Sequence, residues 1–277
     1  EIINRITFIY LDYGKPRSIK DIFERNSVNE VYNFASQSHV GQSWGKMVET
    51  FDSSTMITVR IINEIHNMGG GIKYFQASSC VIFGTPEQVP QVESTSMQPD
   101  NPYGLAKYSA HQLVRYYRER YDYFLCSGIF YNHESPRRTL EFVSRKITNN
   151  VAKIKLGKLH KLELGNLDSI RDWGYAPDYV EGAWMMLQAD KSRDYILATG
   201  KGHTVKQFVE EAFNVVGLDY KKYLCINKSL FRSNDTIYIG NPCKIKSDLG
   251  WYAKTTFKEL INIMVESDIN VEKQKEV

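Results

Sequence analysis

Short apolar runs rich in β-branched and aromatic residues alternate with longer segments of helical periodicity over the first half of the chain. Runs of this kind predict strands, whereas apolar positions spaced three and four residues apart predict helices. The expected strands cover 6–10, 30–35, 72–77 and 124–130, and the expected helices cover 18–25, 50–68 and 103–121. Three glycines at 69–71 should end the second helix. Because strands and helices alternate, we predict an α/β fold with a mostly parallel, doubly wound sheet.

The pattern changes after Asn132, where polar and charged segments become longer. These segments predict loops at 132–138, 165–172 and 228–242, and helical patterns lie between them at 142–156, 178–189 and 205–216. We therefore predict a Rossmann-type domain over residues 1–131. Residues 132–277 should form mainly a smaller C-terminal substrate-binding lobe, with some segments returning to the first domain. The charge-rich end after Asp268 should be frayed.

One expected feature of a dinucleotide-binding domain is missing near the start of the sequence. Such a domain opens with a strand, a glycine-rich loop and a helix. Nothing before residue 30 supplies this pattern, because Gly14 stands alone. We expect the printed sequence to begin inside the domain, without the first strand and its glycine-rich loop. A further segment of about 40–60 residues would be consistent with ordinary domain size.

Composition narrows the possible functions. The chain has 277 residues, of which 42% are hydrophobic, and its net charge of +3 is too small to indicate a nucleic-acid partner. A mildly basic balance suits an anionic substrate. No apolar run approaches the roughly 20 residues that cross a bilayer, and no signal peptide is visible. We expect no membrane association and a cytoplasmic location.

The cysteines and histidines do not show the spacing of a metal site. The six histidines have no HxxxH pair, and the four cysteines have no CxxC pair. We therefore expect no bound metal. Four free thiols are typical of a reducing compartment. The cysteines are Cys80, Cys126, Cys225 and Cys243.

The sharpest chemical pattern is a tyrosine followed four residues later by a lysine, Tyr103 and Lys107. This spacing puts both side chains on one face of a helix. The lysine ammonium can lower the phenol pKa, so that the tyrosine exchanges a proton with a hydroxyl group. Ser78 and Ser79 end a predicted strand, where ligands bind in α/β proteins. The alternatives are an amphipathic helix surface for the first pair and backbone hydrogen bonding for the serines.

Longer motifs surround these residues in a recognisable order. They are EVYNFASQSHVGQSW at 30–44, YFQASSCVIFG at 74–84, NPYGLAKY at 101–108, NHESPRR at 132–138, RKIT at 145–148, LGNLDSIRDWGYAPDYV at 164–180, ATG at 198–200 and LGW at 249–251. With these motifs the chain resembles the GDP-mannose 4,6-dehydratase family of the extended short-chain dehydrogenase/reductase superfamily. The resemblance covers nearly the whole sequence. It implies a nucleotide-sugar enzyme that uses NADP or NAD, with NADP favoured, and that forms a homodimer or homotetramer.

The resemblance also implies roles for individual residues. The catalytic residues would be Ser79, Tyr103 and Lys107. The cofactor would contact Asp12, Tyr13, Ala35, Ser36 and His39, together with Tyr103 and Lys107. The GDP-linked sugar would contact Asn132, Lys146, Arg171, Arg232 and Asp235.

Several of these residues also have structural alternatives. His39 is more typical of a structural residue, and Asn132 can cap a loop. Lys146 can lie on a solvated helix face, Arg171 can pair with Asp172 or Asp168, and Arg232 can be a surface charge. Arg137 and Arg138 are left open between a cofactor phosphate and a subunit contact.

One departure from the family changes the expected reaction. The family places a glutamate two residues after the catalytic hydroxyl, and here that position is Val81. In a 4,6-dehydratase, C4 is first oxidised, and the glutamate then serves the elimination of water across C5 and C6. Valine cannot exchange a proton, and Cys80 would point away along a strand. We therefore expect oxidation or reduction at C4 without elimination. The alternatives are a working dehydratase that uses another base, and a protein that binds a GDP-sugar without catalysis.

Overall fold

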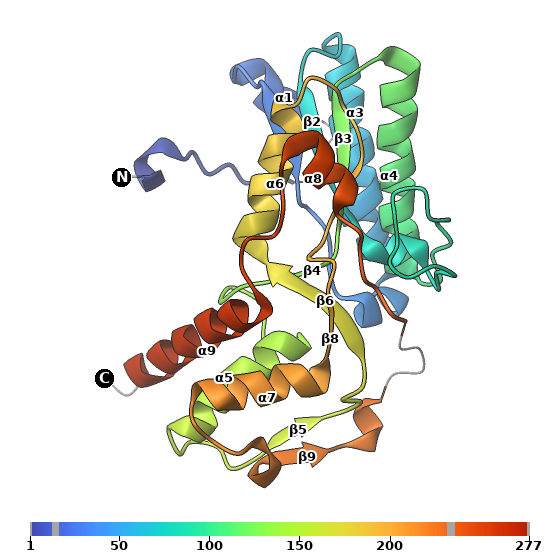
Figure 1. Cartoon of the computed structure of the whole chain (residues 1–277). Coiled ribbons are helices and arrows are strands. Elements are labelled where there is room, and N and C mark those ends of the chain that lie inside the picture. The colour runs from blue at the N-terminus through green and yellow to red at the C-terminus, as the bar shows by residue number, and fades with distance from the viewer. Residues whose placement is uncertain (1, 13–16, 232–235, 276–277) are drawn as a thin grey trace.

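The computed structural model describes residues 2–12, 17–231 and 236–275 (Figure 1). A parallel sheet with the strand order β1-β2-β3-β7 forms its centre. These strands span Glu30–Asn33, Lys73–Ser79, Leu125–Phe130 and Tyr195–Leu197. The register places Ser79, the last residue of β2, opposite Phe130, the last residue of β3. Both strands therefore end at the same edge of the sheet, and the predicted α/β fold with a parallel sheet is confirmed.

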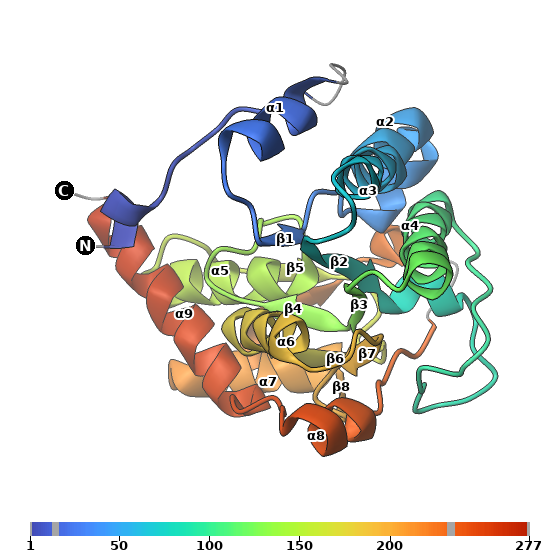
Figure 2. The ribbon, with the colours of Figure 1, turned by 90° about the horizontal axis from the view of Figure 1, so that it is seen from above.

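Helices cover both faces of this sheet (Figure 2). On one face α3 and α4 bury Ile62 and Val114 against Tyr74 of β2. On the other face α6 buries Tyr179 and Ala183 against β2 and β3. The helices α1, α3, α4 and α6 span Arg17–Arg25, Ile57–Asn67, Pro102–Tyr121 and Ala176–Gln188. Both faces of the central strands are thus shielded from solvent, which explains why β2 and β3 lack the alternation of apolar and polar residues typical of a strand with one exposed face.

The long helix predicted over 50–68 is divided in the structure. It consists of α2 (Met47–Phe51), a π-helical turn (Asp52–Met56) and α3. Hydroxyl side chains donate to carbonyls of the preceding turn, with Ser53 Oγ 2.7 Å from Glu49 O and Thr58 Oγ1 2.8 Å from Ser54 O. Such bonds compete with the regular helix ladder and bend it.

The strand predicted over 6–10 is wrong. After a short 3₁₀ turn at Ile2–Arg5, this segment is extended but pairs with no strand in the described part of the chain. Phe8 is 75% exposed, and Tyr10 is fully exposed. An apolar, β-branched run shows a tendency for extended backbone, but a strand also needs a neighbouring strand for its hydrogen bonds. Within the described residues, β1 pairs only with β2.

The second half of the chain builds a separate core beneath the sheet. The helices α5, α7 and α9 enclose it, with Phe208, Ile261 and Met264 among its fully buried side chains. These helices span Val143–Lys155, Val205–Val215 and Phe257–Gln274, and α8 spans Cys243–Leu249. The predicted helices at 142–156, 178–189 and 205–216 are confirmed by α5, α6 and α7.

Short strands run through segments that were expected to be loops. The strands β4, β5, β6, β8 and β9 span Asn132–Glu134, Leu162–Leu164, Ile170–Tyr175, Gly202–Thr204 and Leu224–Ile226. The strands β4, β6 and β8 form one small sheet, and β5 and β9 form another. The loop predictions at 132–138 and 165–172 are therefore wrong for β4 and for the start of β6. Polar residues obscured both strands, because each is short and only half-buried. The remaining 3₁₀ turns span Val40–Trp44, Cys80–Phe83, Tyr220–Lys222 and Lys228–Leu230.

The segment after Asp268 is helical as far as Gln274, which corrects the predicted frayed tail over the described residues. The helix α9 continues to Gln274, and Asp268 is fully buried on it. The carboxylate of Asp268 lies 2.6 Å from Arg145 Nη2 and accepts a 2.7 Å hydrogen bond from Thr148 Oγ1. The charge of Asp268, which precedes the charge-rich tail, is therefore neutralised by a cation of α5. Within the tail, Glu272 is buried and lies 2.6 Å from Lys275 and 3.8 Å from Lys158.

None of the helices in the described part of the chain is both long and apolar enough to cross a membrane.

Replacing Asp268 by asparagine should lower the free energy of unfolding by about 3–5 kcal/mol, because the Arg145 guanidinium would remain buried without its counter-charge. Urea unfolding followed by circular dichroism measures the change. Glu24→Gln, which breaks an exposed pair with Lys20 on α1, should lower it by less than about 1 kcal/mol. Equal losses in the two variants would contradict the assigned role of Asp268.

Candidate active site

The carboxyl ends of the central strands bring together Ser79, Tyr103 and Lys107. Ser79 ends β2, and its Oγ accepts a 3.4 Å hydrogen bond from Val81 N at the start of the next turn. Tyr103 and Lys107 lie in the first two turns of α4, whose start is fixed by Asn101 Oδ1 accepting from Gly104 N at 2.9 Å. Pro102 follows this cap at the first helical position, which suits its fixed φ angle.

Lys107 is a buried cation held by the sheet. Its side chain is 3% exposed, and Nζ donates a 2.9 Å hydrogen bond to Ala77 O, two residues before Ser79. The same Nζ lies 5.9 Å from the centroid of the Tyr103 ring. Burial lowers the pKa of Lys107 to about 8.

Tyr103 is also buried, and burial raises the pKa of its phenol to about 12. The Ser79 hydroxyl and the Arg138 guanidinium lower this pKa, but their effect is smaller than that of burial. The sequence pattern predicted that the Lys107 ammonium would lower the phenol pKa. That expectation is corrected: burial dominates in the structure, and the cation that opposes it is Arg138. The phenol is thus protonated at neutral pH.

Arg138 and His133 reach this site from the NHESPRR segment. Arg138 stacks its guanidinium 3.4 Å from the centroid of the Phe142 ring, and its Nε lies 3.2 Å from a carboxylate oxygen of buried Glu134. His133 Nδ1 lies 2.8 Å from Tyr131 O. Burial lowers the pKa of His133 to about 4, and Arg138 and Lys107 add to this effect. The neutral ring therefore donates from Nδ1 to the carbonyl.

The sequence left the role of Arg138 open and gave no reason to select His133. The one available signal was their place in the same motif as Asn132. Neither residue type nor spacing showed that the charge of Arg138 acts on Tyr103, or that the charge of Lys107 acts on His133.

The predicted cofactor residues lie mainly beyond the carboxyl end of β1. Ala35 N donates to Asn33 Oδ1 at 3.1 Å, and the Ser36 and Ser54 hydroxyls are 2.7 Å apart. His39 caps the 3₁₀ turn at Val40–Trp44, and its ring lies 5.7 Å from that of Phe142. Asp12 is exposed on the segment before α1, and Tyr13 lies outside the described residues.

A dinucleotide fits this donor set. Ser78 Oγ, next to Ser79, is buried without a hydrogen-bond partner in the described structure. Small residues and hydroxyls follow β1, and the Lys107 ammonium lies at the end of β2. These groups lie where parallel sheets bind ligands. Ala35, Ser36, His39, Tyr103 and Lys107 could hold NADP or NAD there, as the sequence predicts.

Three of the five predicted substrate residues lie within the described part of the chain, each on a different element. Asn132 begins β4 two residues after β3 ends. Arg171 lies on β6, and its Nη1 donates to Thr236 O at 3.2 Å. The Arg171 charge also lowers the pKa of the Cys80 thiol, so it acts at the catalytic edge of the sheet. Lys146 lies on α5, where its charge acts on Glu163 of β5. Arg232 and Asp235 lie outside the described residues.

The two residues after Ser79 lack a group suited to proton transfer at neutral pH. Cys80 starts a 3₁₀ turn instead of continuing the strand, so the alternation argument used for it was wrong. The thiol is nevertheless unsuitable as a base, because burial raises its pKa to about 12. Val81 packs against the first turn of α4, where a Cβ atom on Gly104 would lie 2.9 Å from Val81 O.

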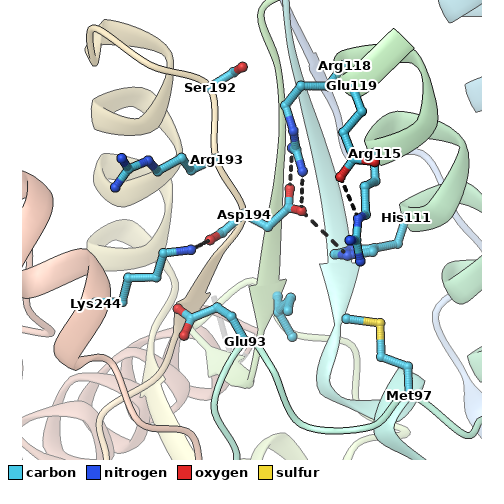
Figure 3. A pocket seen from close by; sticks show the side chains of 11 residues that line it. Glu93, Met97, His111, Arg115, Arg118, Glu119, Ser192, Arg193, Asp194 and Lys244 are labelled. Atoms are coloured by element: carbon cyan, nitrogen blue, oxygen red, sulfur yellow. Dashed lines mark hydrogen bonds and ion pairs between the residues drawn. The ribbon is translucent and has the colours of Figure 1, made fainter.

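A cavity of about 420 Å³ lies elsewhere, along the later turns of α4 (Figure 3). Asp194 is its central residue and accepts from Arg118 Nη1 and Nη2 at 2.7 and 2.6 Å and from Ser127 N at 2.8 Å. His111 Nε2 is 3.8 Å from the same carboxylate. These contacts join α4, β3 and the start of β7, so we interpret the cluster as a structural brace. No cluster of three or more potential metal ligands was found among the described residues.

Comparison with known proteins identifies the family. Residues 1–264 match the family described as GDP-mannose 4,6 dehydratase. GDP-mannose 4,6 dehydratase 1 of Arabidopsis thaliana is 41% identical over 273 residues, which cover 97% of this chain and 75% of that protein. The chain belongs to the GDP-mannose 4,6-dehydratase family. The human GDP-mannose 4,6 dehydratase is 37% identical over 282 residues, with 95% of this chain and 76% of that protein covered.

Solved structures support the fold of this family member. RMD from Pseudomonas aeruginosa, complexed with NADPH, has a TM-score of 0.88 at 18% identity and covers 95% of this chain and 88% of its own. The dTDP-glucose 4,6-dehydratase of Bacillus anthracis, in complex with NAD, has a TM-score of 0.82 at 20% identity, with 97% and 80% covered. Both comparisons confirm the extended Rossmann-type architecture.

The buried Lys107 ammonium should give the protein a distinct pH dependence of stability. Its pKa is about 8 in the folded state and 10.5 in the unfolded chain. Between these values the unfolded chain binds more protons, so stability rises as the pH increases above about 8. From pH 7 to pH 9 this contribution is about 1 kcal/mol.

Urea unfolding of the wild type and of Lys107→Met at both pH values measures this contribution. The variant should lack the rise that the wild type gains from Lys107. Parallel pH dependences would show that Lys107 is not titrating in a buried site.

Proposed function

We propose that this protein is an NAD(P)-dependent enzyme that oxidises or reduces C4 of a GDP-linked hexose or heptose, without eliminating water. One observation carries the proposal: Ser79, Tyr103 and Lys107 converge at the carboxyl edge of the sheet, and Val81 stands where the resemblance to the family implies a glutamate. Membership of a family named for GDP-mannose supports the substrate class.

The residues have distinct tasks at the sugar. NADP or NAD, when bound, supplies the acceptor or donor of hydride. Tyr103 carries the proton that the C4 oxygen gains or loses, and Ser79 Oγ hydrogen-bonds the same oxygen. Because the pKa of Tyr103 is about 12, the phenol is ready to donate a proton to a C4 ketone. Oxidation of a C4 hydroxyl requires the phenolate, so that direction should be favoured at higher pH.

Lys107 and the substrate residues position the reactants. The hydrogen bond from Lys107 Nζ to Ala77 O fixes the ammonium beside Tyr103. Arg171 suits a diphosphate, because a guanidinium can donate two parallel hydrogen bonds to phosphate oxygens. We assign Asn132 to the sugar diphosphate, Lys146 and Arg171 to the nucleotide and its phosphates, and Arg232 and Asp235 to the diphosphate and ribose.

A second function is a complete GDP-mannose 4,6-dehydratase that uses another base. The relatives at 37–41% identity that carry this name favour it. Elimination requires a group that takes the C5 proton and assists the loss of the C6 hydroxyl. The C4 oxidation product is lighter than the GDP-sugar by two hydrogens, whereas the dehydratase product is lighter by one water.

We also propose that the enzyme works in the cytoplasm as a homodimer or homotetramer. All four cysteines are free, which suits a reducing compartment. Exposed apolar side chains on α2, the following turn and α4 support self-association. They include Met47, Val48, Met56, Leu105 and Tyr116.

Incubation with GDP-mannose and NADP should increase the absorbance near 340 nm, because NADP is reduced. The sugar product should be a C4 ketone that retains every oxygen of GDP-mannose. Tyr103→Phe should slow this reaction by roughly 10²–10⁴-fold, because the proton carrier is removed. Mass spectrometry identifies the product, and other GDP-hexoses and a GDP-heptose are tested in parallel. A product lacking one water would refute the C4-only function and support the dehydratase. Binding with neither a change in absorbance nor any product would favour a non-catalytic GDP-sugar-binding protein.

Val81→Glu should add elimination to the reaction, because the carboxylate restores acid–base catalysis at this position. The expected product is lighter than the GDP-sugar substrate by one water, about 18 mass units. Val81→Gln is the matched control, because it has nearly the same shape but cannot exchange a proton. Elimination of water by both variants or by neither would show that the residue at position 81 does not control this step.

A further inference from the structure

Gln91 is a fully buried polar residue in the long loop between β2 and α4. Its backbone N donates to Ile239 O at 2.9 Å, and its backbone O accepts from Asn241 N at 2.8 Å. Its side-chain Oε1 accepts from Tyr131 OH at 2.9 Å and from Ile239 N at 3.1 Å. Its Nε2 donates to Gln88 O at 2.9 Å. Gln91 therefore connects three segments of the chain through one satisfied network, which is costly to leave half-made.

The segment held by Gln91 is residues 236–241, which we name the strap. The strap rises from the lower lobe towards α8 in Figure 1. It forms two isolated bridges, between Gln91 and Gly240 and between Arg171 and Tyr238. Tyr238 OH also donates to Gly84 O at 2.7 Å. Because the strap has no regular secondary structure, these few bonds determine its position.

The packing around Gly240 leaves little freedom in that position. A Cβ atom on Gly240 would lie 2.5 Å from Ala198 Cβ and 2.7 Å from Tyr131 Cε2. Gly240 N also lies 3.3 Å from Asp172 Oδ2. The strap therefore packs tightly against the ring of Tyr131, whose hydroxyl donates to Gln91. A shift of the strap would move this ring.

Tyr131 and the strap, which Gln91 joins, each adjoin a predicted substrate residue. Tyr131 immediately precedes Asn132. On the other side, Thr236 O in the strap accepts from Arg171 Nη1, and Tyr238 packs in the apolar cluster that contains Cys80. Ser79, Tyr103 and Lys107 are instead held by β2 and α4. Loosening the strap should therefore disturb diphosphate binding more than proton transfer.

We propose that Gln91 is a positioning residue for the GDP-sugar: through the strap and Tyr131 it sets the places of Arg171 and Asn132 relative to Ser79. This inference rests on the proposed GDP-sugar function and adds the residue that maintains the shape of the diphosphate site. Gln91 does not touch the reacting atoms. Its effect should appear in KM and Kd instead of in kcat.

Gln91→Met tests the inference, because methionine has a similar length and lacks the hydrogen-bonding groups. KM and the calorimetric Kd for GDP-mannose should rise by about tenfold or more, with kcat within about threefold of the wild type. Tyr131→Phe removes one of the same bonds and should act in the same direction. The double variant should lose less than the sum of the single losses, since both changes break one network. Tyr131→Phe and Tyr238→Phe provide the test if Gln91→Met fails to fold.

Thr148→Val is the matched control, because it removes a buried hydrogen bond to Asp268 on α9. It should lower the melting temperature without changing Kd for GDP-mannose. A lower melting temperature of Gln91→Met with unchanged KM and Kd would overturn the positioning role. A loss confined to kcat would overturn it as well.

Hydrogen exchange of the amides at 236–241 separates failure of this inference from failure of the proposed function. Gln91→Met should accelerate exchange in the strap, with or without a ligand. Unchanged exchange would overturn the inference even if the wild type turns over GDP-mannose. If the wild type does not bind GDP-mannose, the proposed function fails, whereas faster strap exchange in Gln91→Met still shows that Gln91 holds the strap in place.

Discussion

The hydrogen bond from Lys107 Nζ to Ala77 O is the contact on which the geometry of the site depends. It joins the second turn of α4 to the end of β2, two residues before Ser79. Burial disfavours the charged form of Lys107 and lowers its pKa, so this arrangement reduces stability at neutral pH. In return, it holds a donor and a tyrosine at fixed places along one helix. A longer or more exposed lysine contact would leave Tyr103 without a defined neighbour at the sheet edge.

A second buried charge, the carboxylate of Asp172, attaches the second half of the chain to this edge of the sheet. Asp172 is fully buried and accepts from Thr199 N, Thr199 Oγ1 and Gly200 N at 2.6–3.0 Å. Together with its contact to Gly240, these bonds tie β6, the segment after β7 and the strap to one carboxylate. A carboxylate with several donors can remain buried, whereas an apolar residue at this position would leave those donors unpaired. The location of Arg171, the neighbour of Asp172, follows from this arrangement.

The sequence predicted the parts of the fold whose burial is uniform along an element. The strands β2 and β3 are buried almost throughout because helices cover both faces, and α4 has a clear cap and a long periodic face. The apolar run at 6–10 failed because composition does not reveal whether a neighbouring strand exists. The prediction for the tail after Asp268 failed because a charge-rich sequence does not reveal that Glu272 is buried and paired with Lys158 and Lys275.

Local spacing also explains which parts of the site were predictable. Tyr103 and Lys107 are one helical turn apart, so their proximity follows from the sequence alone. Gln91 lies in a polar loop, and its partners are 40 and 148 residues away. No periodicity encodes such contacts. Arg138 acts on Tyr103 across 35 positions of sequence, as 138 minus 103 shows, and only the fold brings them together.

The ionisation of the groups at the sheet edge bears on the proposed choice between redox chemistry and elimination. A base that removes the C5 proton must be deprotonated near neutral pH and have access to the sugar. Burial keeps both Cys80 and Tyr103 protonated, with pKa values of about 12. Glu134 is buried, its Oε2 accepts from Ser144 Oγ at 2.8 Å, and it is paired with Arg138. Lys107 has the pKa closest to neutrality, but its Nζ is directed to Ala77 O. None of these four groups is therefore suited to removing the C5 proton near neutral pH, which supports the proposed C4 function.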